Sequence, residues 1–225
     1  MTSLVSVGFD EDAAVALRSN YRVLRSGALA EYGLSILGRS RLCCLCGLRD
    51  VSELDHYLPK TIFPEYSVLT LNLIPVCGVC NRLKSEHYKA LDGRKAFIHA
   101  YFDDLPYEEE FLVARVDVDR AVLPFFEVAQ TSQMSSETFD VLSGQFKRFG
   151  LAMYYAEEAV ELLADKSDAI EGYFSDGGAL AVQEYLARDA RSVRKRHGAN
   201  FWKSATLSAA ASSTDFCEGG FRLLS

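Results

Sequence analysis

The sequence predicts an α+β fold in which a cysteine-rich segment separates an N-terminal helical segment from a mainly helical C-terminal region with one β-hairpin. Three observations predict this: two Cys-x-x-Cys pairs in the first half, strict apolar-polar alternation after residue 110, and helical periodicity on both sides. We place the boundaries at residues 1–42, 43–102 and 103–225. The 225 residues, 49% of them hydrophobic, can form one core, or one core with a small satellite.

The first predicted element is helical and covers residues 10–38. Asp10 and Asp12 supply an N-cap signal, and apolar residues follow at helical spacing as far as Ile36. Residues 26–27, Ser-Gly, interrupt the pattern. The segment therefore forms either one long helix or two short helices.

Two groups of basic residues recur at helical spacing. Arg18, Arg22 and Arg25 share one flank of the first helical segment. A solvated face and a stripe that tracks phosphates explain them equally well. A contact with phosphates is less favoured for the second group, which consists of Arg188, Arg191, Arg194, Lys195 and Arg196.

Four of the six cysteines form two pairs, Cys43 with Cys46 and Cys77 with Cys80, with 30 residues between the pairs. Each pair places two thiolates on one tight turn, and two such turns that face each other supply a tetrahedral site for a structural Zn²⁺. The alternative is a coincidence of buried cysteines. The intervening insert must fold back so that the turns meet, which makes it the place to look for chemistry.

The composition and the other cysteines restrict the setting. The N-terminal residues turn acidic before a long apolar stretch forms, and no run approaches the ~20 apolar residues of a membrane span. We therefore expect a cytoplasmic protein with no membrane partner, neither disordered nor fibrous. Metal ligands or free thiols are then more typical than disulfides. Cys44 could compete with Cys43, whereas Cys217 fits a small core residue.

Four polar residues interrupt the apolar insert and the segment that follows it: Asp55, His56, Asn72 and Asn81. Residues 51–57 alternate as a strand does, so that Asp55 and His56 point to opposite faces. Taken singly, His56 is typical of a hydrogen-bonded structural residue, Asn72 of a turn and Asn81 of a helix cap. Their joint occurrence with four cysteines favours a functional site.

The order of these residues resembles the HNH endonuclease family, in its zinc-stabilised ββα-metal branch. The shared pattern is Cys-x-x-Cys, then Asp-His-x-x-Pro-Lys, then Asn-Leu-x-x-x-Cys-x-x-Cys-Asn-x-x-Lys, and it covers residues 43–84. The resemblance implies that His56 is the first H, that Asn72 is the central N, and that Asn81 stands where the last H often stands. It also implies that Asp55 is the metal-binding acid before the catalytic histidine.

The resemblance also implies a mechanism that suits these residue types. His56 would act as general base on water, since a neutral imidazole accepts a proton near physiological pH. Asp55 and Asn81 would hold a hard divalent cation, Mg²⁺ or Mn²⁺, with open positions for water and phosphate. The amide of Asn72 would bridge backbone groups and orient the loop that carries His56.

The expected partner is DNA, with Lys60, Arg82 and Lys84 near the phosphate backbone. The net charge of −7 seems to argue against this partner. The charge is unevenly distributed, however, because residues 18–95 hold 12 basic and 7 acidic residues, a local net charge of +5. Local charge therefore favours nucleic acid around the cysteine-rich segment.

The C-terminal elements follow from periodicity. Residues 111–119 alternate and are followed by 121–129, which predicts a β-hairpin. Residues 136–166 predict one amphipathic helix or a helical pair. Residues 176–178, Asp-Gly-Gly, predict a turn between that region and a further helix. A last helix is expected around residues 200–211.

Two functions from different classes fit the sequence. The first is a metal-dependent DNA endonuclease with His56 as general base, which by resemblance could serve antiviral defence beside a protein partner such as an ATPase subunit. The second is a catalytically silent, zinc-stabilised subunit that binds nucleic acid or protein. Cleavage of plasmid DNA distinguishes them.

Overall fold

A computed structural model describes residues 5–224, and the chain divides into two compact units, Met1–Asp103 and Asp104–Ser225. Within the described residues there are eight α-helices and two two-stranded antiparallel sheets, in keeping with a mixed α and β fold. The second boundary lies within one residue of the predicted one. The N-terminal helices belong to the first unit, and do not form the separate segment expected for residues 1–42.

Two short helices open the first unit, α1 (Glu11–Ser26) and α2 (Ala30–Leu37). The side chain of Asp10 caps α1 by accepting a hydrogen bond from the N–H of Ala13 at 2.8 Å. The helical pattern breaks after Ser26, as the Ser-Gly pair indicated. These helices join the first unit because they share an apolar cluster with the hairpin, which contains Leu24, Ile36, Leu54 and Leu73.

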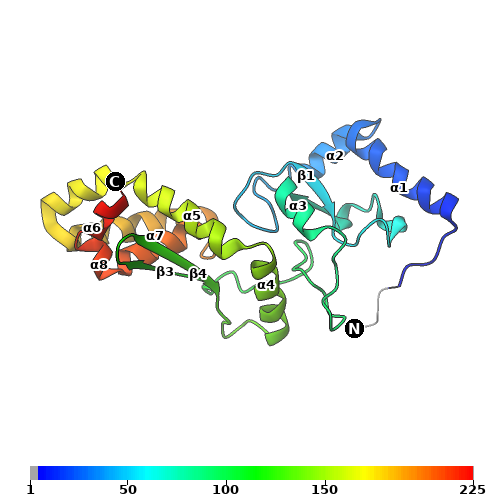
Figure 1. Ribbon diagram of the computed structural model, residues 1–225. Coiled ribbons are helices and arrows are strands. Elements are labelled where there is room, and N and C mark those ends of the chain that lie inside the picture. Colours follow the sequence, from blue (N-terminus) through cyan, green and yellow to red (C-terminus); the bar gives the residue numbers. More distant parts are fainter. Residues whose placement is uncertain (1–4, 225) are drawn as a thin grey trace. The chain divides into compact units, whose positions relative to one another are not determined.

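The cysteine-rich segment forms a hairpin followed by a helix. Strand β1 (Glu53–His56) pairs antiparallel with β2 (Leu73–Val76), so that Asp55 lies opposite Ile74 and His56 opposite Leu73. Two 3₁₀ turns, η1 (Pro64–Tyr66) and η2 (Thr70–Asn72), form part of the connection. Helix α3 (Gly78–Lys84) then returns to lie beside β1 (Figure 1).

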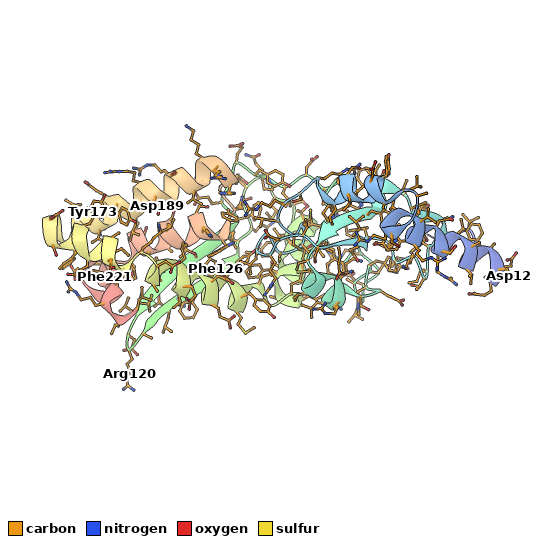
Figure 2. The ribbon with its side chains drawn as sticks, turned by 90° about the horizontal axis from the view of Figure 1, so that it is seen from above. Asp12, Arg120, Phe126, Tyr173, Asp189 and Phe221 are labelled. Carbon is orange, nitrogen blue, oxygen red and sulfur yellow. The ribbon has the colours of Figure 1, made fainter. Side chains whose placement is uncertain are left out.

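The second unit is a hairpin covered by helices. Its strands β3 (Leu112–Val118) and β4 (Val122–Val128) pair along their whole length, which confirms the predicted hairpin. Arg120 projects from the tip of the hairpin (Figure 2). The helices are α4 (Ser136–Arg148), α5 (Leu151–Ala164), α6 (Ser167–His197), α7 (Trp202–Ser212) and α8 (Thr214–Cys217), followed by the 3₁₀ turn η3 (Gly220–Leu224).

Two predicted breaks in this helical region have different outcomes. Gly150, with a positive φ of 62°, separates α4 from α5, so the region is a helical pair. The Asp-Gly-Gly sequence is a kink inside the long element α6: Gly177 and Gly178 leave helical geometry, and Gly178 has a φ of 65°. The positive φ angles of Gly150 and Gly178 favour glycine because it lacks a Cβ atom.

The core of the second unit lies where α7 contacts both β3 and α6 (Figure 1). Asn200 fixes the approach to α7, because its Oδ1 accepts hydrogen bonds from the N–H groups of Phe111 and Leu112 while its Nδ2 donates to the carbonyl of Glu109. One side chain therefore joins the start of the hairpin to the segment before α7. No helix among residues 5–224 combines the length and apolar character needed to cross a membrane.

Candidate functional site

The four paired cysteines come together, as their spacing predicted. Cys43 and Cys46 lie in a turn whose ends are joined by the bridge between Leu42 and Asp50. Cys77 is the N-cap of α3, and its sulfur accepts a hydrogen bond from the N–H of Cys80 at 3.4 Å. The four sulfur atoms lie within 4.8 Å of one another, and all four residues are buried.

This cluster fits a tetrahedral zinc ion. Zn–S bonds of about 2.3 Å place the sulfur atoms of a Cys₄ site about 3.8 Å apart, within the observed separation. Hydrogen bonding to neighbouring thiols, followed by burial, raises the pKa of Cys43 and Cys80, whereas hydrogen bonds from those two thiols lower the pKa of Cys46. Four buried thiolates need a cation, so metal binding here would be coupled to proton release.

The other two cysteines stand apart from the cluster. Cys44 is half-buried next to Cys43, but its thiol is not among the four that converge. The expected competition between Cys43 and Cys44 is therefore decided by geometry in favour of Cys43. Cys217 is fully buried in the core of the second unit, where its thiol donates to the carbonyl of Ala210 at 3.3 Å.

Asp55 forms a buried ion pair with Lys84. The Lys84 ammonium lies 2.9 Å from Oδ2 of Asp55 and donates a hydrogen bond to the carbonyl of His56 at 2.8 Å. Burial raises the pKa of Asp55, and Lys84 opposes that shift. The prediction that Lys84 contacts a nucleic-acid phosphate is wrong, because its side chain is 0% exposed. Lys84 instead joins the end of α3 to the end of β1.

His56 is buried and held through one ring nitrogen. Its Nε2 lies 2.9 Å from the carbonyl oxygen of Ser67, which can only accept, so Nε2 carries the proton. The other ring nitrogen, Nδ1, then has a free lone pair, and no hydrogen-bond partner for it occurs among residues 5–224. Burial lowers the pKa of His56 to about 4, with Lys60 and Lys84 adding to the shift.

Helix α1 supplies one wall of the His56 site. The ring of Tyr21 meets the His56 ring edge-on at 4.5 Å between centroids, and its hydroxyl donates to the carbonyl of Leu54 at 2.8 Å. The ammonium of Lys60 lies 4.5 Å from the centre of the Tyr21 ring. The cleft has a volume of about 220 Å³. Its lining includes Tyr21, Asp55, His56, Lys60, Asn81 and Ser85.

Asn72 holds the loop between the strands, as predicted for its amide. Its Oδ1 accepts from the N–H of Leu58 at 2.7 Å, and its Nδ2 donates to the carbonyls of Leu58 and Tyr66, both at 3.1 Å. The N–H of Tyr57 also donates to the Asn72 carbonyl at 2.9 Å. Asn72 thereby fixes the chain directly after His56 without entering the cleft.

Asn81 is oriented by a carboxylate that the sequence analysis did not single out. Its Nδ2 donates a hydrogen bond to Glu53 at the start of β1. An ionised carboxylate only accepts, so the amide must turn its nitrogen to Glu53, which leaves Oδ1 as an available oxygen ligand. Ser85, the residue that ends α3 beside Asn81, has a positive φ of 50°, a strained conformation for serine.

The remaining candidates for contact with nucleic acid, Lys60 and Arg82, have side chains that solvent can reach. Lys60 is partly exposed at the cleft, and Arg82 is exposed on α3. Sequence reasoning missed Tyr21, Glu53 and Ser67. Glu53 lies two residues before Asp55 and therefore shares its strand face, a signal that was readable. Ser67 acts through its backbone carbonyl, and because every residue has one, the sequence gives no signal for this role.

Comparison with known proteins adds one relative. The chain is 25% identical over 213 residues to a protein named Ea31 from Escherichia phage lambda, and the match covers 89% of this chain and 72% of that protein. No protein-family model and no solved structure matches the chain. The similarity therefore extends over both units, beyond the cysteine-rich segment.

If the cluster binds zinc, replacing Cys43 should change the zinc content of the protein, whereas replacing its neighbour Cys44 should not. Cys43→Ser should release zinc and cause cooperative loss of structure in the first unit, because three thiolates bind the ion less well. Cys44→Ser, one residue away, should keep one zinc ion per chain. Metal analysis and thermal melting test this, and equal zinc loss in both variants would contradict the assignment.

Asn72→Ala should destabilise the first unit. It leaves the N–H of Leu58 and two carbonyls without their partners, at a cost of about 3 kcal/mol in the free energy of unfolding. In urea unfolding, a zinc-binding dye detects zinc released from the cysteine cluster and therefore reports the unfolding of the first unit. Asn200→Ala removes a comparable clamp from the second unit and should leave that signal unchanged. A loss below about 0.5 kcal/mol for Asn72→Ala would show that these hydrogen bonds are not structural.

Proposed function

We propose that this protein is a metal-dependent endonuclease of the HNH type that hydrolyses DNA phosphodiester bonds, with β1, β2 and α3 as its ββα-metal finger and a structural zinc ion on the four cysteines. One observation carries the proposal: Nε2 of His56 is hydrogen-bonded to the Ser67 carbonyl, so the lone pair of Nδ1 is free at the cleft. A histidine fixed in this way is ready to take a proton.

The tautomer and the fixed position of His56 support the role of general base. Its pKa of about 4 keeps the imidazole neutral throughout the physiological range, since burial disfavours the charged form. The same burial makes the ring a weaker proton acceptor than an exposed histidine. Tyr21 and the Ser67 carbonyl restrict the ring, so Nδ1 keeps one direction. In the proposed reaction His56 accepts the proton of the attacking water at Nδ1.

The oxygen ligands beside His56 suit a hard divalent cation. Asp55 offers a carboxylate, and the Glu53 hydrogen bond leaves Oδ1 of Asn81 available. A bound Mg²⁺ or Mn²⁺ would polarise the scissile phosphate and stabilise the departing oxygen. Lys84 is a positioning residue in this scheme, because it holds the Asp55 carboxylate and the His56 backbone together.

The charge of the segment supports a nucleic-acid substrate. Residues 18–95 carry a net +5 in a chain whose total is −7, and Lys60 lies at the cleft. Arg82, exposed one residue after Asn81, is a further candidate for a phosphate contact. A role in antiviral defence beside a partner such as an ATPase subunit rests on the family resemblance alone.

One observation favours the other candidate function, a catalytically silent subunit that binds nucleic acid or protein. The Lys84 ammonium already neutralises the Asp55 carboxylate inside the unit, so a metal ion would have to share that group. In this alternative the buried His56 and Asp55 only stabilise a zinc-containing fold.

His56→Ala should lower cleavage of supercoiled plasmid at least about 100-fold, because loss of a general base removes that share of the rate. The assay uses the zinc-loaded full chain with Mg²⁺ or Mn²⁺, and gel electrophoresis measures nicked and linear products. His197→Ala, an exposed histidine in the second unit, is the matched control and should cleave as the unaltered chain does.

Two results would contradict the endonuclease. Equal cleavage by the unaltered chain and His56→Ala would remove His56 from the mechanism. Binding of the plasmid without cleavage at any concentration of Mg²⁺ or Mn²⁺ would favour the silent binding subunit.

A further inference from the structure

An arginine flank of α1 lies next to the cleft. At 100° per residue, positions 18, 21, 22 and 25 fall within an arc of about 100° around the helix. Arg18, Arg22 and Arg25 therefore share a flank with Tyr21. Because Tyr21 contacts the His56 ring, the arginine flank begins at the cleft itself.

The cations of this flank lie close to the lysine of the cleft. Arg18 contributes to the lowering of the Lys60 pKa, after burial, and Arg25 favours the ionised form of Tyr21. Such effects require short distances between the groups. The arginines of α1 and Lys60 therefore lie close together on one side of His56, and their like charges repel each other.

Most of the flank lacks carboxylate partners within the chain. Among residues 5–224, Arg22, Arg25 and Lys60 form no ion pair, and Arg18 pairs only with the exposed Glu11 at 2.6 Å. Surface pairs of that kind contribute little and exchange readily. Three other cations of the first unit do form ion pairs: Arg41 with Asp50, Arg94 with Asp92, and Lys95 with Asp103.

The total charge makes this pattern informative. The chain holds 31 acidic and 24 basic residues, so carboxylates are abundant, yet none pairs with Arg22 or Arg25 among the described residues. Arg22 and Arg25 are three residues apart, or about 4.5 Å along the helix axis at 1.5 Å per residue, which is close to one phosphate step of about 3.4 Å on one DNA strand.

We propose that the flank of α1 formed by Arg22 and Arg25, with Lys60 at its end, binds the phosphate backbone of duplex DNA on one side of the scissile phosphate. The placement relative to a scissile phosphate rests on the proposed endonuclease function, whereas the binding surface itself does not. Between the two interpretations of these arginines that the sequence left open, the unpaired charges beside the cleft favour the phosphate stripe.

The test measures binding separately from cleavage. Full-length, zinc-loaded protein carrying His56→Ala is titrated, without Mg²⁺, into a fluorescein-labelled 20-base-pair duplex, and anisotropy gives the affinity between 50 and 200 mM salt. Adding Arg22→Gln and Arg25→Gln should weaken binding at least about tenfold at 50 mM salt. The slope of log affinity against log salt should fall by about 2, because each phosphate contact contributes about 0.9.

Two control pairs isolate the surface. Arg41→Gln with Arg115→Gln removes the same charge from arginines that pair with Asp50 and Asp117, and should leave the slope unchanged. Arg22→Lys with Arg25→Lys keeps the point charges and should retain the slope. Unchanged thermal melting verifies the fold of every variant.

Any of these results would overturn the inference: an equal loss of affinity in both Gln pairs, an unchanged slope in Arg22→Gln with Arg25→Gln, or no duplex binding by the His56→Ala protein. The inference would also be overturned if Arg22→Gln with Arg25→Gln weakened binding to phosphatidylserine vesicles but left binding to the duplex unchanged. The plasmid assay judges the endonuclease independently. Binding with the predicted slope but without cleavage would uphold this surface and contradict the proposed function.

Discussion

The hydrogen bond between Nε2 of His56 and the carbonyl of Ser67 determines what the cleft of the first unit can do. It fixes the tautomer, and therefore decides which ring nitrogen keeps a lone pair. The reversed tautomer would turn the same buried ring into a donor at Nδ1, unable to accept a proton from water. The proposed chemistry depends on this one contact with a backbone carbonyl.

The rest of the first unit can be understood as support for that contact. Lys84 joins α3 to the His56 backbone, and Asn72 fixes the chain just after it. The four cysteines link the turn before β1 to the start of α3, so a zinc ion there would set the position of the helix that carries Asn81. These cross-links hold β1, β2 and α3 together around His56.

Local patterns predicted a large part of this structure. Asp10 marked the start of α1, alternation marked β3 and β4, and the spacing of the cysteines marked their cluster. Side chains whose role depends on tertiary contacts were not predictable in this way. Lys84 looked like a surface cation on a short helix, yet it is buried because Asp55 and the His56 carbonyl satisfy its ammonium. Tyr21 gave no signal, since its role arises only when α1 docks beside β1.

The most direct test of the central claim is the protonation of the His56 ring in solution. Long-range ¹H–¹⁵N NMR on the zinc-loaded, Mg²⁺-free protein distinguishes the two tautomers, and His56→Gln assigns the signal among the four histidines. We expect a neutral ring with its proton on Nε2 at pH 7, and protonation of Nδ1 only near pH 4. A proton on Nδ1 at pH 7, or a titration midpoint at or above the ordinary value of about 6.5, would contradict the account.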